Sequence, residues 1–218
     1  MPFFYVLHVK TKPLADCLDA IRFLCNPTEK QRAHITVRGP YKKKIDVRGI
    51  NEKVTGGIVS FDGIGNFFDS CQNTVFFRCS APRLRAVWSK SDFPFNPHLT
   101  IYDGKSPEFA HRLFDLISRY EYPLRFRAEE LEAIESRKGQ NSMSLALAFN
   151  SDLVRRAVGR DINAAEVPKL SEQRRLDLID RLCRYLAALP MKQSAPVADQ
   201  HNLPFPGGVA APMKKNAS

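Results

Sequence analysis

The chain has 218 residues, of which 44% are hydrophobic and 26% charged, so it holds enough apolar material for a folded core and is not a wholly disordered chain. A formal net charge of +10 favours an anionic partner, such as a nucleic acid, a nucleotide or a membrane surface, without choosing among them. No window approaches the roughly 18 uninterrupted apolar residues of a spanning helix, and the N-terminal residues lack a secretory signal pattern, so we expect a cytoplasmic protein.

Strand-like and helix-like segments alternate over the first 150 residues. Residues 3–9 are aromatic and β-branched and predict a strand, whereas residues 14–25 place apolar side chains at helical spacing and predict a helix. Ser106 and Pro107 are typical of a helix N-terminus. The pattern predicts an α+β fold with antiparallel strands. Further expected elements are strands at 34–38, 57–62, 74–80, 98–102, about 123–136 and 143–149, helices at 46–54 and from 107 to about 120, and a turn at 63–66.

The sequence changes character after residue 150. Residues 151–190 place apolar side chains at helical spacing among many charges, and their formal net charge is only +2. We expect this helical extension to be a helix pair packed on the main domain, with a dedicated partner or RNA surface as the alternative. Residues 191–218 are rich in Pro, Gly, Ala and Ser and predict a disordered tail. The expected main domain is therefore 1–150.

Two of the five histidines stand in the same short pattern. The pattern His-apolar-Thr-apolar begins at His34 and again at His98. About 0.03 such matches are expected by chance at this composition, so coincidence is a poor explanation for two. On a strand, His34 and Thr36 point to one face while the apolar residues beside them enter a core. The second motif repeats this arrangement with His98 and Thr100.

If the two strands lie side by side or across a cleft, two imidazoles and two hydroxyls converge on one polar site. Two imidazoles can act as general base and general acid in one reaction cycle. Arg38 and Tyr102, the next residues expected on the same face, add a phosphate-binding cation and an aromatic hydroxyl. These groups together suit the non-bridging oxygens of a phosphodiester.

Other interpretations of the two histidines are weaker. A single histidine at a strand end is more often structural, but a matched pair with matched threonines reverses that preference. The sequence has no His-x-His, no His-Glu-x-x-His and no carboxylate at short fixed spacing from either histidine, so we expect a site without metal or cofactor. Gly-x-Ser-x-Gly is absent, and no cysteine has an activating context. We interpret His8, in the first expected strand, as structural.

With these paired motifs, each on an expected strand, the chain resembles the 2H phosphoesterases, the superfamily that includes 2′-5′ RNA ligase-like proteins and RNA cyclic phosphodiesterases. The resemblance covers about residues 1–150 and leaves the helical extension outside the family core. It implies a bilobal α+β fold, in which two antiparallel-sheet lobes with flanking helices surround a central cleft and each lobe supplies one motif. It also implies metal-independent hydrolysis of 2′,3′-cyclic phosphates or 2′-5′ linkages.

The resemblance also implies a role for each motif residue. His34 and His98 would be the acid/base pair, with His98 as the base and His34 as the acid. Thr36 and Thr100 would hydrogen-bond the phosphate oxygens. The expected substrates are RNA ends or small oligonucleotides, and ligation would be the same chemistry in reverse. The competing hypothesis is a non-catalytic RNA- or nucleotide-binding module that uses the same basic cleft.

Two further groups of residues are candidates for substrate binding. Of the formal net charge, +6 falls on residues 1–150, so a phosphate-bearing substrate explains it better than a membrane surface does. Aromatic side chains near the expected cleft could stack on a base, with packing in the core or a turn as the alternative: Tyr41, Phe67, Phe68, Phe95 and Tyr102. A basic cluster beside the first motif could steer a polyanion, with a solvated loop as the alternative: Arg32, Arg38, Lys42, Lys43 and Lys44.

Overall fold

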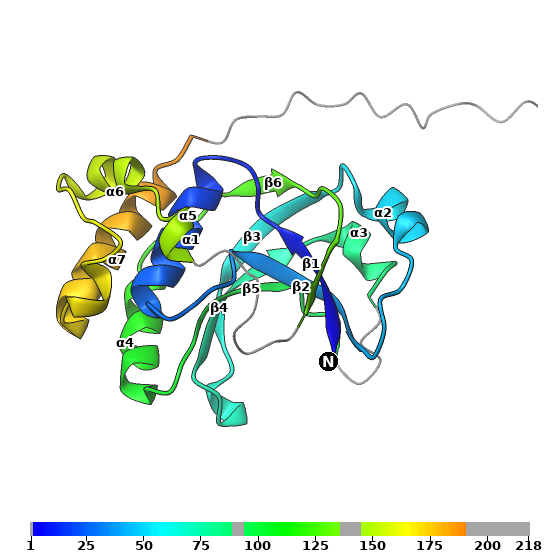
Figure 1. Cartoon of the computed structure of the whole chain (residues 1–218), viewed down its shortest axis with the longest axis horizontal. Helices are drawn as coiled ribbons and strands as arrows, with labels where there is room; N and C mark the ends of the chain where they lie inside the picture. Colours follow the sequence, from blue (N-terminus) through cyan, green and yellow to red (C-terminus); the bar gives the residue numbers. More distant parts are fainter. Residues whose placement is uncertain (1, 89–93, 136–144, 191–218) are drawn as a thin grey trace, which may run out of the picture.

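The computed structural model describes residues 2–88, 94–135 and 145–190 and is an α+β structure built on one antiparallel sheet (Figure 1). The strands are β1 (Phe3–His8), β2 (His34–Tyr41), β3 (Ile58–Asn66), β4 (Thr74–Ser80), β5 (His98–Asp103), β6 (Arg125–Arg127) and β7 (Glu132–Glu135). The α-helices are α1 (Leu14–Cys25), α2 (Arg48–Val54), α3 (Pro82–Arg85), α4 (Pro107–Ile117), α5 (Leu145–Ala148), α6 (Ser151–Val158) and α7 (Glu172–Ala187). Short 3₁₀ helices cover Phe68–Ser70 and Val167–Lys169.

The sheet is strongly curled. Within the described residues it has seven strands in the order β6-β3-β4-β5-β2-β1-β7, so β6 and β7 lie at its two edges. Only residues 128–131 separate these two edge strands along the chain. A link of that length reaches at most about 18 Å. In a flat sheet of seven strands the edges would be about 28 Å apart. The link therefore requires a sheet whose edges curve toward each other.

The helices on one side of the sheet form two layers (Figure 1). α1 lies against the sheet, and every residue in it is buried. α7 packs on α1 and on α4, so the helices after residue 150 share the main hydrophobic core, as expected for a packed helix pair. None of the described helices is both long and apolar enough to cross a membrane. The domain boundary at 150 stays a prediction, and the expected disordered tail lies outside the described residues.

The expected strand at 123–136 is wrong, because the chain forms two strands at opposite edges of the sheet. β6 pairs with β3, and β7 pairs with β1. Between them the chain is held at Ala128, whose N–H donates to the Gly57 carbonyl while its own carbonyl accepts from the Gly56 N–H. The segment can pair with two different strands because the sheet curls, and no local sequence pattern predicts that curl.

Two further expectations are corrected. The segment expected as a strand at 143–149 forms helix α5, and its first two residues lie outside the described part. Its Leu-Ala-Leu-Ala sequence alternates, but Leu and Ala are the strongest helix formers, and Leu145 is fully buried. The turn expected at 63–66 is part of β3. Gly63, at φ +85°, accompanies a β-bulge between Phe61 and Ile64, and the actual turn follows Asn66.

Candidate active site

The two motif strands are neighbours at the centre of the sheet. β2 and β5 run antiparallel and meet at one ladder pair, Ile35 opposite Leu99. Both of these side chains are fully buried on the helix side. Residues one step away on each strand point to the other face, so all four motif side chains lie on that face. The structure therefore brings together the residues that the sequence singled out: His34, Thr36, His98 and Thr100.

The two histidines make the same main-chain hydrogen bond. Nδ1 of His34 lies 2.7 Å from the carbonyl oxygen of Arg32, and Nδ1 of His98 lies 2.8 Å from that of Asn96. A carbonyl oxygen only accepts, so Nδ1 carries the hydrogen in each neutral ring and Nε2 keeps its lone pair. In both motifs the acceptor is two residues before the histidine. The main-chain carbonyl before each motif strand thus sets the tautomer and orientation of each ring, and it leaves the hydrogen off Nε2 in the neutral form.

His34 is partly buried in a positively charged environment. Burial, followed by the nearby guanidinium of Arg22, lowers the pKa of His34 to about 3. The rings of His8 and His98 act in the same direction, and the hydrogen bond to Arg32 opposes them. His34 is therefore neutral at pH 7 in the ligand-free protein. A neutral imidazole with a free Nε2 is a proton acceptor.

His98 has aromatic neighbours on the same face. Its ring lies 4.7 Å from the ring of Phe76 and 5.3 Å, edge to face, from that of Phe67, measured between centroids. A pocket of about 340 Å³ opens beside it. A pocket of this size with aromatic walls suits a single ring system such as a nucleobase. Its lining residues are Phe67, Ser70, Gln72, Trp88, Pro94, Asn96 and His98.

The hydroxyls of Thr36 and Thr100 are free of hydrogen bonds within the described part of the chain, and both residues are partly exposed. Their positions beside the two histidines allow them to donate to one bound group. Arg38 continues the first motif, but its guanidinium is partly engaged, since Nη1 donates to the Val87 carbonyl at 3.0 Å and Nε to the Tyr41 hydroxyl at 3.1 Å. Arg38 and Tyr41 therefore border the motif face as a bonded pair.

Tyr102 does not share the motif face, contrary to the expectation from strand alternation. A β-bulge between Thr100 and Tyr102 shifts the register against β4. Tyr102 is 6% exposed, its ring packs 5.0 Å from that of Phe109 in α4, and its hydroxyl accepts from the Ser106 N–H at 3.1 Å. It belongs to the helix side of the sheet.

Two other candidate aromatics also have packing roles. Phe95 packs edge to face against Trp88 at 5.2 Å between ring centroids, and the guanidinium of Arg85 lies 4.6 Å above its ring. Phe68 stacks on His111 of α4 at 4.2 Å. Among the five aromatic candidates, Phe67 is the one whose ring contacts a motif histidine in the described structure.

The structure adds residues to this face that the sequence did not single out. His8 pairs with His34 across β1 and β2, with 5.7 Å between ring centroids, and its Nε2 lies 3.9 Å from a carboxylate oxygen of Glu132. Arg78 pairs with His98 across β4 and β5 and is exposed. His8 and Arg78 come beside the motif histidines through the pairing of β1 with β2 and of β4 with β5. No sequence motif indicates that pairing.

A close backbone approach explains one glycine on this face. Gly65 on β3 lies opposite Phe76, and a Cβ at Gly65 would lie only 2.4 Å from the Phe76 ring and 3.2 Å from Nε of Arg78. Any larger residue would push that ring, and with it the wall beside His98. Glycine at position 65 therefore keeps the aromatic wall in place.

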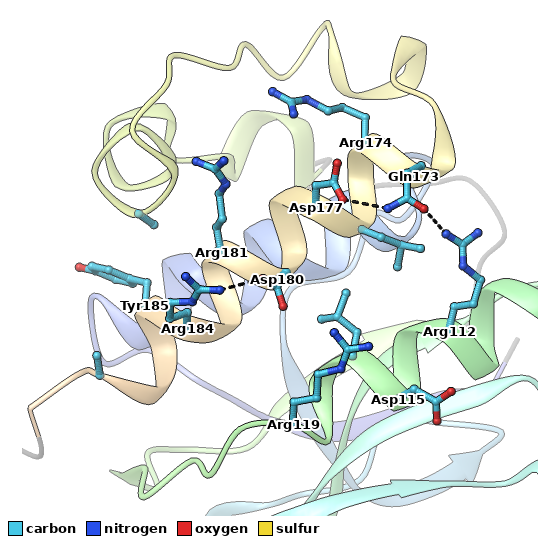
Figure 2. Close-up of a pocket in the computed structure, with 14 residues that line it drawn as sticks. Arg112, Asp115, Arg119, Gln173, Arg174, Asp177, Asp180, Arg181, Arg184 and Tyr185 are labelled. Carbon is cyan, nitrogen blue, oxygen red and sulfur yellow. Dashed lines mark hydrogen bonds and ion pairs between the residues drawn. The ribbon is translucent and has the colours of Figure 1, made fainter.

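A larger hollow, of about 960 Å³, lies between α4 and α7 on the helix side of the sheet (Figure 2). Two of its five lining arginines are paired with acids or amides: Arg112 bonds to Glu172 at 3.0 Å and to Gln173, and Arg184 lies 3.3 Å from Asp180. None of the residues that line this hollow belongs to the paired motifs. We therefore place the candidate site at the paired motifs.

Among the described residues, no three His, Cys, Asp or Glu side chains gather in a way that could hold a metal ion. Comparisons with known proteins add no assignment: no model of a known protein family matches the chain, and no curated protein sequence matches it.

Proposed function

We propose that the chain is a metal-independent phosphodiesterase that acts on RNA ends or small oligonucleotides carrying a 2′,3′-cyclic phosphate or a 2′-5′ linkage. The observation that carries this proposal is the antiparallel pairing of the two His-x-Thr motifs on one sheet face, with both histidines held in the same tautomer. Two positioned imidazoles and two hydroxyls are what acid/base cleavage of a phosphodiester needs.

The resemblance to the 2H phosphoesterases supports the same proposal and its finer fold. In a bilobal arrangement, β2 with β1 and β7 would form one lobe, and β5 with β4, β3 and β6 the other. A single ladder pair joins these two halves, which fits a cleft along the line between the motif strands. Reverse ligation would use the same groups.

For a 2′,3′-cyclic phosphate, we propose in-line attack of water on phosphorus. One imidazole takes a proton from the water as its oxygen bonds to phosphorus, and the other donates a proton to the ribose oxygen as its bond to phosphorus breaks. The product is a ribose phosphomonoester with one free hydroxyl. Thr36 and Thr100 would donate hydrogen bonds to the non-bridging oxygens, whose negative charge grows during the attack.

The environments of the two histidines favour a definite division of roles. His34 has a lowered pKa and is neutral in the ligand-free protein, so we propose that it is the base. His98, beside the pocket, would then be the acid. This is the reverse of the assignment that the resemblance implies, and it rests on the burial and positive charge around His34.

The pocket beside His98 supports a nucleoside end as the bound group. Phe67 and Trp88 offer ring faces for a base, and Arg78 on the same face offers a cation for an adjacent phosphate. These groups would also serve a module that only binds such an end. Two histidines with matched tautomers are more than binding alone requires.

A substrate panel with chromatographic product analysis tests the proposal. Purified full-length protein is incubated in EDTA with nucleoside 2′,3′-cyclic phosphates, cyclic-phosphate-ended RNA, and 2′-5′ and 3′-5′ oligoadenylates. We expect turnover of at least one of the cyclic or 2′-5′ substrates and none of the 3′-5′ oligoadenylate. Binding of cyclic-phosphate-ended RNA without turnover of any substrate would contradict the proposal and favour the binding module.

A further inference from the structure

A buried arginine of α1 links the two motif regions through hydrogen bonds to their main chains. Arg22 of α1 is 5% exposed, and its guanidinium donates to the carbonyl of Thr100 in the second motif. It also donates, through Nε at 3.3 Å, to the carbonyl of Gln31 in the loop before the first motif, and Nη2 lies 3.6 Å from a carboxylate oxygen of Glu29. One side chain therefore bonds both to the loop before His34 and to the strand that carries His98.

An acidic residue one turn earlier on α1 holds the same loop. Asp19 is 2% exposed, and its carboxylate accepts from the Ala33 N–H at 2.7 Å and from Nε of Arg32 at 2.8 Å. The carbonyl that lies between these two anchored groups is that of Arg32, which fixes Nδ1 of His34. The carboxylate thus fixes the peptide on which the tautomer of His34 depends.

We propose that Asp19 and Arg22 are a buried positioning pair that sets the tautomer and the place of His34 relative to the second motif strand. The proposal deepens the proposed function and rests on it for any effect on turnover. A buried charge is costly unless it is paired and hydrogen-bonded, and a helix that carries two such residues at this point has a specific reason to keep them. We infer that these two residues are kept because they hold the two motifs in a fixed position relative to α1 and to each other. Small errors in reactive geometry reduce rates strongly.

The guanidinium has an electrostatic effect as well as a geometric one. The charged or titratable groups that act on His34 are Arg22 from α1, His8 from β1 and His98 from β5, whereas Arg32 of the preceding loop acts through its main-chain carbonyl. After burial, Arg22 has the largest effect on the pKa of His34, which it lowers. A neutral side chain at this position would therefore raise the pKa of His34, so that a larger share of the rings would already be protonated in acid and unable to accept a proton from water.

Ring-nitrogen NMR of His34 in the full-length protein tests the positioning role without any substrate. In the wild type we expect one neutral tautomer at pH 7, with hydrogen on Nδ1. In Arg22→Met and in Asp19→Asn we expect a mixture of tautomers. We also expect kcat on a cyclic phosphate to fall by about 10- to 100-fold with KM within about twofold of the wild type. The acid limb of the kcat profile of Arg22→Met should move to higher pH.

Arg175→Met is the matched control. Arg175 is a partly buried arginine that donates to the carbonyls of Leu24 and Cys25 at the end of the same helix rather than to either motif or to the loop before His34. It should leave the His34 tautomer and kcat unchanged. Arg22→Lys keeps the charge but cannot reach both carbonyls, and it decides the matter if Arg22→Met does not fold, since we expect it to show mixed tautomers and reduced kcat.

A folded Arg22→Met, or failing that Arg22→Lys, with the wild-type tautomer and kcat would overturn the proposal. If the wild type turns over no substrate, the proposed function fails, and the NMR result still decides the positioning role alone.

Discussion

The two motif strands carry the same four-residue pattern in different surroundings. On β2, the partly buried His34 is influenced by the charge of Arg22 of α1 and lies beside the ring of His8. On β5, His98 lies between aromatic rings at the edge of a pocket. The Nδ1 hydrogen bond is the same in both, but the neighbouring groups are a guanidinium and an imidazole on one side and aromatic rings on the other. A repeated motif thus gives matched geometry, and the environment of each copy is the basis for the proposed division of base and acid roles.

The largest expected effect is loss of either histidine. We expect His34→Ala and His98→Ala each to lower kcat on a 2′,3′-cyclic phosphate by about 10²- to 10⁴-fold, because each removes one proton transfer. The check is steady-state hydrolysis in EDTA, with circular dichroism to show that both variants fold. Unchanged activity in either variant would show that the histidine of that strand takes no part in the reaction.

A smaller effect is expected from the aromatic wall on the His98 side. Phe67→Ala should raise KM for a nucleoside cyclic phosphate by about tenfold or more, since base stacking contributes about 1–3 kcal/mol. Phe68→Ala is the matched control, because the neighbouring ring stacks on His111 of α4 instead. Equal KM changes in both variants, measured by initial rates, would argue against a base site beside His98.

The cation on the same side should act through charge alone. Arg78→Ala is expected to raise KM for a cyclic-phosphate-ended dinucleotide by about threefold to tenfold at low salt, and the difference should shrink as salt rises. Arg125→Ala, at an exposed arginine of edge strand β6, should have no such effect. A salt-independent change, or the same change with Arg125→Ala, would exclude a phosphate contact at Arg78.

The buried histidine on the β2 side should also leave a trace in stability. The pKa of His34 is about 3 in the folded protein and about 6.5 when exposed, so the unfolded chain binds more protons between these values. The free energy of unfolding should therefore fall as the pH drops below about 6.5, by at most about 1.4 kcal/mol per pH unit from this group. His34→Asn, compared by urea denaturation at pH 7 and 5, should lose less stability than the wild type. Equal losses of unfolding free energy in the two proteins would show that burial does not lower the pKa of His34.

Most residues of the candidate site and part of the fold could be predicted from the sequence. Alternation alone placed the motif histidines and threonines on strand faces, and helix α1 and the N-terminus of α4 matched their local signals. Tyr102 was misplaced because a bulge depends on the partner strand. His8 was interpreted as structural, and Arg78 and Arg22 were not considered, because each becomes relevant only through pairing or packing between segments far apart in the chain.

An activated leaving group tests the division of roles between the two histidines most directly. A nitrophenyl phosphodiester expels a weakly basic phenolate that needs little protonation, so loss of the general acid should matter little with it. The account predicts that His98→Ala regains most of the wild-type rate on this substrate, whereas His34→Ala stays inactive. Recovery in His34→Ala with none in His98→Ala would contradict the assignment of base and acid to the two strands.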